Sequence, residues 1–134
     1  MNKILSKMQK AFVEKDAESI EKLVDDTDFS KNGSSYIEIL CQLLKEEWHI
    51  KHEDIVSILE DIKDPKAIDI LYDIAQRKFN YYIRDEKYPL ARRCIWALWK
   101  IGTEEAIYKI KLLSKFDDED VQKYAVKQLD RLKD

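Results

Sequence analysis

An apolar pattern that repeats along the chain constrains its fold more than any other feature. Apolar residues recur at spacings of three and four, which is typical of helices with one buried face. A shift of 39 residues superposes Leu59 on Leu98, Ile62 on Ile101, Ala67 on Ala106, Ile68 on Ile107 and Leu71 on Ile110. A shift of 31 residues from the later helix superposes Leu90 on Val121, Cys94 on Ala125, Leu98 on Leu129 and Ile101 on Leu132. Repeats of this length indicate stacked helical units, and the eight extra residues of the longer shift predict an inserted loop at 79–88.

The same spacing predicts eight helices, joined by short links into hairpins. Their expected ranges are 2–14, 17–25, 35–47, 52–62, 65–78, 89–101, 103–114 and 118–132. Asp64 before Pro65, and Thr103 before two glutamates, are typical helix starts, because a side-chain oxygen can accept from the free N–H groups of the first turn. Gly102 lies where a helix end favours a left-handed residue.

Composition agrees with an all-α fold. The chain of 134 residues contains two glycines and two prolines, too few for the many turns of a β-fold. Its length predicts a single domain, 1–134, with one core. The expected helices 35–47 and 89–101 carry apolar stripes that no single hairpin can cover, so the hairpins are expected to stack on one another.

The segment 90–107 carries a resemblance to a known family. Its sequence is Leu90-Ala-Arg-Arg-Cys-Ile-Trp-Ala-Leu-Trp-Lys-Ile-Gly102, followed by Thr103-Glu-Glu-Ala-Ile107. This resembles the HEAT-like repeat of the phycobilisome-lyase type, most clearly over 52–132, although Trp99 stands where the family usually has glycine. The resemblance implies a right-handed α-solenoid of about four antiparallel hairpins, in which the second helix of each hairpin lines the concave side.

The charge balance bears on partners and on location. The chain has 24 basic and 27 acidic residues, a formal net charge of -3, which disfavours general affinity for nucleic acid. Its first residues do not form a secretory signal, and no stretch is apolar enough to span a membrane. Cys41 and Cys94 lie far apart on apolar helical faces and are expected to be reduced. We therefore expect a cytoplasmic protein.

Candidate partner-binding residues gather on the expected helix 89–101. Arg92, Trp96 and Trp99 lie at positions i, i+4 and i+7, so they share one face of this helix, away from its apolar stripe. Tryptophan and arginine are the residues most enriched at binding hot spots. The alternative is that either tryptophan packs against a neighbouring hairpin or beneath the insertion.

Further candidates come from the insertion and from helices expected on the same side. The insertion contributes Tyr81, Tyr82, Arg84 and Tyr88. Over 76–93 six basic residues outnumber two acidic ones, so this region can stack on nucleobases or receive an acidic protein, while the rest of the chain, at -7, repels phosphate. The 39-residue shift places Glu53, Ser57 and Glu60 at positions equivalent to Arg92, Trp96 and Trp99. The remaining candidates are Arg93, Lys123 and Lys127.

Metal binding and catalysis find little support in the sequence. His49 and His52 lack the spacing of zinc hydrolases and further ligands, and we expect them to be exposed histidines at a helix start. The acidic run 117–120 favours a helix start over a calcium loop. No phosphate-binding glycine loop or nucleophile motif is present. We predict no catalytic residue, metal ligand or cofactor.

These features together predict a non-catalytic protein-binding module. Small free-standing bacterial proteins that resemble this family often serve as immunity proteins, so the resemblance implies a chain that neutralises a cognate toxin, such as a basic nuclease domain. The alternative is a nucleic-acid-binding or DNA-repair-type helical repeat protein, with strongly salt-dependent binding to DNA.

Overall fold

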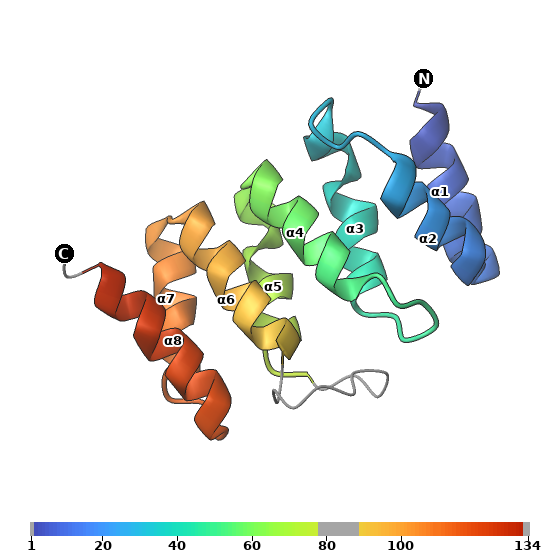
Figure 1. Ribbon diagram of the computed structural model, residues 1–134. Helices are drawn as coiled ribbons and strands as arrows, with labels where there is room; N and C mark the ends of the chain where they lie inside the picture. The colour runs from blue at the N-terminus through green and yellow to red at the C-terminus, as the bar shows by residue number, and fades with distance from the viewer. Residues whose placement is uncertain (1, 78–88, 133–134) are drawn as a thin grey trace.

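The computed structural model describes residues 2–77 and 89–132, and this part of the chain is helical without strands (Figure 1). Its α-helices are α1 (Lys3–Glu14), α2 (Ala17–Asp26), α3 (Ile37–Leu44), α4 (His52–Ile62), α5 (Ile68–Ile74), α6 (Pro89–Ile101), α7 (Glu104–Leu113) and α8 (Glu119–Arg131). Short 3-10 helices, Gly33–Tyr36 and Pro65–Ala67, precede α3 and α5. The all-α prediction is confirmed, whereas the expected insertion at 79–88 lies outside the described residues.

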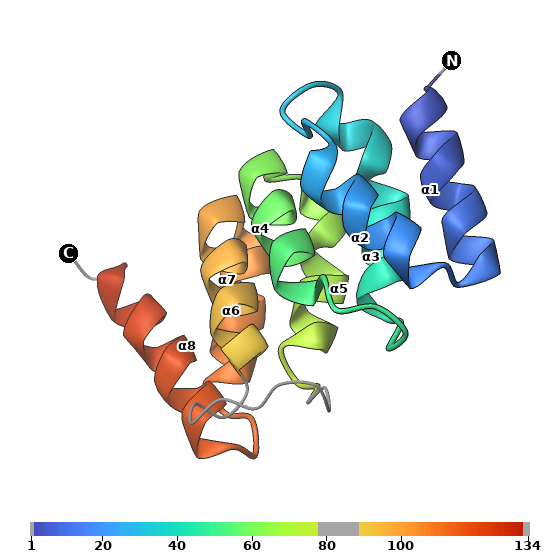
Figure 2. The same ribbon diagram turned by 45° about the vertical axis from the view of Figure 1, so that its right-hand side comes forward.

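The helices form two layers (Figures 1 and 2). One layer holds α2, α4, α6 and α8, and the other holds α1, α3, α5 and α7. Each even-numbered helix packs against the helix that precedes it in the chain, and within the first layer α6 packs against both α4 and α8. In the second layer α3 contacts α1 and α5, and α5 contacts α7. The chain therefore alternates between the layers as it advances.

Helix ends follow the capping chemistry expected from the sequence. The Asp64 side chain accepts from the N–H of Lys66, and the Thr103 hydroxyl accepts from the N–H of Ala106. Gly102 ends α6 with a φ of 70°, a left-handed conformation that costs little without a Cβ. These caps satisfy backbone groups that have no partner inside the helix.

Two predicted helices are shorter in the structure. The range 35–47 was expected as one helix, but α3 covers Ile37–Leu44 only, and the range 65–78 begins with a 3-10 turn before α5. The end of α3 has a clear physical cause. The His49 and His52 side chains hydrogen-bond the carbonyls of Leu43 and Glu46, so two carbonyls at and just after the end of α3 have side-chain partners.

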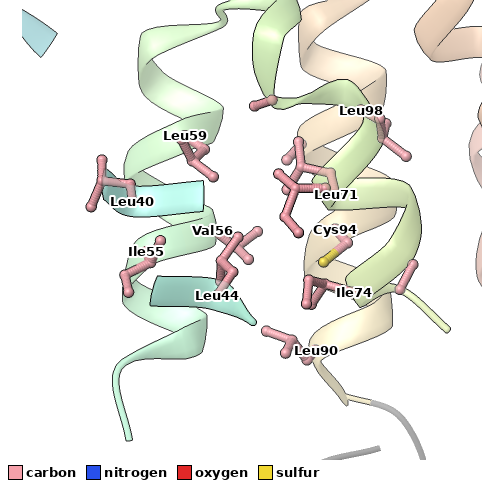
Figure 3. Packing of buried hydrophobic residues seen from close by; sticks show 14 of the residues in the cluster. Leu40, Leu44, Ile55, Val56, Leu59, Leu71, Ile74, Leu90, Cys94 and Leu98 are labelled. Carbon is pink, nitrogen blue, oxygen red and sulfur yellow. The ribbon is translucent and has the colours of Figure 1, made fainter. Parts of the chain in front are cut away.

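One hydrophobic cluster joins the two layers (Figure 3). Leu40 and Leu44 of α3 face Ile55 and Leu59 of α4, and the same arrangement recurs between α5 and α6. The residues of the second pair that Figure 3 labels are Leu71, Ile74, Leu90, Cys94 and Leu98. All of these side chains are buried, and each buried leucine contributes about 1.5 to 3 kcal/mol through the removal of apolar area from water. The apolar stripe predicted on 89–101 is confirmed for Leu90, Cys94 and Leu98, whereas Ile101 is half-buried.

The two histidines are buried, so the expectation of exposed histidines was wrong. His49 is 1% exposed and His52 is 0% exposed, and their rings stack with centroids 4.3 Å apart. His49 Nε2 lies 2.7 Å from the Leu43 carbonyl, and His49 Nδ1 accepts from the N–H of Lys51. Burial lowers the pKa of both side chains, to about 4 for His52, whose pKa the neighbouring His49 lowers further. The pair is a neutral structural bridge between α3 and α4.

The first prediction concerns the core of α6. Leu98 is fully buried, so Leu98→Ala is expected to lower the free energy of unfolding by about 2 to 5 kcal/mol, measured by urea denaturation. Val126 of α8 is 46% exposed, and Val126→Ala serves as the control, with an expected change below about 0.5 kcal/mol. An unchanged denaturation midpoint for Leu98→Ala contradicts this packing.

The second prediction concerns the pH dependence of stability. His52 has a folded pKa of about 4 against an ordinary value of 6.5, so the unfolded chain binds the extra proton first as the pH falls. Stability is full above pH 6.5 and decreases below it, by about 1 to 2 kcal/mol near pH 5. Urea denaturation at several pH values measures this slope. His52→Gln keeps a donor for the Glu46 carbonyl and is expected to reduce this slope, while His49 keeps its own contribution. An equal slope in both proteins argues against the assignment to His52.

Candidate functional site

The helices α6 and α8 are neighbours in one layer (Figure 1). Side chains of both helices line a groove between them. Its volume is about 600 Å³. Its lining residues are Arg92, Arg93, Trp96, Lys123, Tyr124, Lys127, Gln128 and Arg131. On each helix these side chains recur at spacings of one, three or four, so they occupy one face beside the buried stripe.

The groove is strongly basic. Among the described residues that line it, five carry a positive charge and none carries a negative one. Lys123 Nζ lies 3.2 Å from Glu119 Oε1, but both side chains are largely exposed. The pair therefore lowers the positive potential of the groove only a little. Arg93 Nη1 donates to Ser57 Oγ of α4 at 3.1 Å, a bond to a neutral partner that positions the guanidinium and adds no negative charge. The arrangement attracts anionic groups.

The Trp96 indole lines the groove and stacks on the Trp99 indole behind it. The rings of Trp96 and Trp99 lie 5.2 Å apart at an interplanar angle of 23°. Arg131 Cζ lies 5.1 Å from the centroid of the Trp96 ring, and Lys100 Nζ lies at the same distance from it. Each such cation contact contributes about 0.5 to 1 kcal/mol at exposed sites. Trp96 is therefore held in place as a half-buried platform before any partner arrives.

Gln128 adds a buried polar side chain to the lining of the groove. It is 8% exposed and is the one buried residue among the eight that line the groove. Its Oε1 atom has no hydrogen-bond partner in the described part of the chain, and neither has the buried Nε1 of Trp99. A buried acceptor without a partner costs about 1 to 3 kcal/mol, so this position carries a stability cost.

The structure brings five of the predicted partner-binding residues together. Those in the groove are Arg92, Arg93, Trp96, Lys123 and Lys127. Ser57 reaches the site through its bond to Arg93, and Trp99 lies beside Trp96 without lining the groove. Glu53 and Glu60 are half-buried on α4 and do not line the groove. The candidates Tyr81, Tyr82, Arg84 and Tyr88 lie outside the described residues.

Three lining residues were missed by the sequence prediction. They are Tyr124, Gln128 and Arg131. The signal was present, because the 31-residue shift that aligns the apolar frames superposes Arg93 on Tyr124 and Lys100 on Arg131. The unpaired state of Gln128 leaves no trace in a sequence pattern, since it depends on which donors surround it in space.

A second groove lies between α3 and α5 and contains Cys41. Its charges are mixed, with Lys45 and Lys66 near Glu38, Asp69 and Asp73. Burial raises the pKa of the Cys41 thiol to about 11, so the thiolate form that acts as a nucleophile is scarce at neutral pH. Burial also raises the pKa of Cys94. Neither thiol has the low pKa of a reactive cysteine.

Comparisons leave the relationships of the chain open. No protein-family model, curated protein or solved structure matches the chain. The resemblance to HEAT-like repeats therefore stays a prediction. Among the described residues, no helix is long and apolar enough to cross a lipid bilayer, and no three side chains of metal-binding type cluster together.

The third prediction concerns Gln128, the buried polar side chain in the lining of the groove. Gln128→Met replaces the unpaired acceptor by an apolar side chain of similar length, so the free energy of unfolding is expected to rise by about 1 kcal/mol. Gln122 of the same helix is the matched control, because its Nε2 donates to the Phe116 carbonyl and Gln122→Met breaks that bond. Urea denaturation of both variants measures the difference. Equal losses of stability in the two variants contradict an unpaired Gln128.

Proposed function

We propose that this chain is a non-catalytic protein-binding module that receives its partner on the layer formed by α2, α4, α6 and α8. The observation that carries the proposal is the basic groove beside Trp96, where preorganised cations and an aromatic platform lie together. Arginine and tryptophan in such a setting are typical binding anchors. The alternation of the chain between two layers supports the finer proposal of a right-handed, HEAT-like α-solenoid of about four antiparallel hairpins.

The distribution of charge favours a protein over a nucleic acid. In α2 four acidic residues outnumber one lysine, giving -3, and α4 has four acidic residues and no basic one, giving -4. In α6 three basic residues stand without an acidic one, giving +3. A nucleic acid is negative along its whole length, so α2 and α4 repel it. A protein surface can match both signs along the layer.

An immunity protein of the bacterial cytoplasm is the form of this proposal that the resemblance implies. A basic toxin surface would meet the acidic helices α2 and α4, while an acidic segment of the same toxin would enter the groove. Binding of this kind neutralises a toxin by covering its active site. Opposite charges on α2 and α4 on the one hand and on α6 on the other also steer the encounter and fix its orientation.

The alternative, a nucleic-acid-binding or DNA-repair-type protein, is supported by one observation. Five cations next to stacked indoles resemble a surface on which single-stranded nucleic acid can lie. Such binding weakens steeply with salt, because bound counterions are released from the phosphates. We prefer the protein partner because the acidic helices of the same layer limit any longer contact with nucleic acid.

The fourth prediction tests the partner. The double variant Arg93→Glu and Lys127→Glu reverses two charges of the groove, and it is expected to weaken the complex more than tenfold. Tagged full-length protein is purified from its native cell after nuclease treatment, and proteins that accompany it in stoichiometric amount are identified by mass spectrometry. The interaction is then measured with purified partner by isothermal titration calorimetry.

The matched control carries the same change in charge on the other layer. Lys111 of α7 and Lys115 after it are exposed, and Lys111→Glu with Lys115→Glu is expected to keep the partner. Equal loss in both double variants means that net charge alone governs binding, which contradicts a site in the groove. Loss of the bound material on nuclease treatment favours the nucleic-acid alternative.

A further inference from the structure

We infer that this chain forms a two-fold dimer, in which the layer of α2, α4, α6 and α8 faces the same layer of a second copy. The inference is carried by α4 and α6, which bear opposite charges at equivalent positions. A two-fold axis that runs between these two helices, parallel to them, brings α4 of each copy onto α6 of the other. The inference concerns this chain alone, so it goes beyond the proposed function and does not depend on it.

The 39-residue repeat makes α4 and α6 equivalent elements of the layer. The helix α4 ends at Ile62 and α6 ends at Ile101, and each is followed by a residue with positive φ, Lys63 and Gly102. The two helices pack side by side and run in the same direction (Figures 1 and 2). A residue of α4 and the residue 39 positions later therefore occupy corresponding places on the two helices.

The exposed side chains of these two helices have opposite charges at such places. Among the side chains that the structure describes, α4 exposes Asp54 and Asp61 only, and α6 exposes Arg92, Arg93 and Lys100 only. The shift of 39 residues places Asp54 at the position of Arg93, and Asp61 at the position of Lys100. Seven residues separate the two charges on each helix, a rise of about 10.5 Å, so the spacing of the acidic pair matches that of the basic pair.

A rotation about the proposed axis leaves the position along the helices unchanged. Asp54 of one copy then meets Arg93 of the other, and Asp61 meets Lys100. Because each copy supplies both helices, the dimer contains four such ion pairs. The other two-fold axis in the plane of the layer, which crosses the helices, places α4 on α4 and α6 on α6 and opposes like charges. The charges therefore favour one of the two arrangements.

The position between the two charges adds complementarity of size. Trp96 of α6 is equivalent to Ser57 of α4, and both side chains are half-buried. In the proposed dimer each indole lies opposite a small hydroxyl side chain of the other copy. Arg131 and Lys100 already hold the Trp96 ring in place, which lowers the entropy lost on association. Burial of the exposed part of the ring adds apolar area to the charge pairs.

Within one copy the charged side chains make only weak or neutral contacts of the kind that a second copy can supplement. Asp54 Oδ2 lies 3.8 Å from Lys51 Nζ, and the Asp54 side chain is 58% exposed. Arg93 donates to the uncharged Ser57 hydroxyl and keeps further N–H groups for a carboxylate. Formation of an ion pair with a second copy therefore breaks no strong contact.

The outer helices agree with the same axis, and the layer is large enough for a weak dimer. The axis brings α2, which exposes three acidic residues and one lysine, onto α8, which exposes three basic and two acidic residues. Four helices about 15 to 20 Å long and about 8 to 10 Å apart form a face of about 600 Å². A standard interface buries about 800 Å² on each side. Exposed ion pairs are also screened by salt, so we expect the dimer at low salt and high protein concentration.

An exchange of charge between the two helices tests the inference on the full-length chain. Asp54→Arg with Asp61→Lys makes both helices basic, and Arg93→Asp with Lys100→Asp makes both acidic. Each double variant alone is expected to self-associate more than about tenfold more weakly than the unmodified protein. An equimolar mixture of the two variants restores every pair of opposite charges and is expected to form a heterodimer. Sedimentation velocity measures all four samples, and the dissociation constant of the unmodified dimer is expected to rise more than about tenfold from about 0.05 M to about 0.5 M salt.

A matched control changes the net charge without touching α4 or α6. Lys111→Glu with Lys115→Glu alters the charge by as much as Arg93→Asp with Lys100→Asp, at exposed positions of α7 and the residues after it, and is expected to keep the affinity within about twofold. The substituted side chains of all three variants are exposed, and thermal denaturation checks that each variant folds. If a variant is damaged, ¹⁵N–¹H NMR of the unmodified protein remains decisive, because dilution is expected to shift the Trp96 indole signal.

Several results would overturn the inference. These are an unmodified protein that stays monomeric at low salt up to millimolar concentration, variants that self-associate as tightly as the unmodified protein, a mixture that forms no heterodimer, or dilution shifts confined to other faces. If the chain is monomeric but its native partner is lost on reversing Arg93 and Lys127, the face belongs to that partner alone. If the mixture forms the heterodimer while that reversal leaves partner binding unchanged, the dimer is correct and the proposed partner site is wrong.

Discussion

The packing of α6 against four other helices is the constraint on which the rest of the structure depends. This helix contacts α4, α5, α7 and α8, and no other described helix has as many neighbours of comparable extent. Its Leu90, Cys94 and Leu98 side chains are buried, as are its small residues Ala91 and Ala97. Because α6 packs against four helices, only a narrow strip of its surface faces solvent. Arg92, Arg93, Trp96 and Lys100 lie on this strip. The position of the groove follows from the burial of the helix beneath it.

The groove combines features that cost stability. Clustered cations repel one another, and Gln128 holds a buried acceptor that has no hydrogen-bond partner among the described residues. In another part of the chain, a lysine reduces the repulsion between residues of like charge. Lys51 lies 2.8 Å from Asp25 and 3.8 Å from Asp54, so it relieves repulsion where the acidic helices α2 and α4 meet. Local departures from a stable arrangement concentrate at functional sites in natural proteins, which supports binding at the groove.

The sequence predicted the helices well where side-chain spacing alone determines them. The ranges of α4 and α6 match the predicted 52–62 and 89–101, because their apolar stripes are regular and their ends carry clear signals at Asp64, Pro65 and Gly102. The end of α3 was missed because it depends on bonds from His49 and His52 to backbone carbonyls, which no residue pattern reveals. The face of α6 was predicted from spacing, whereas the contribution of α8 needed the packing of the two helices.

The side chains that line the groove agree with the proposed role in binding. The lining residues are arginine, lysine, tryptophan, tyrosine and glutamine. The chain has two histidines, and both are buried between α3 and α4, with their Nε2 atoms bonded to backbone carbonyls. The two cysteines have raised pKa values and do not line the groove. Within the described residues, the groove therefore brings positive charges and an aromatic ring together, which are the groups that the proposed binding uses.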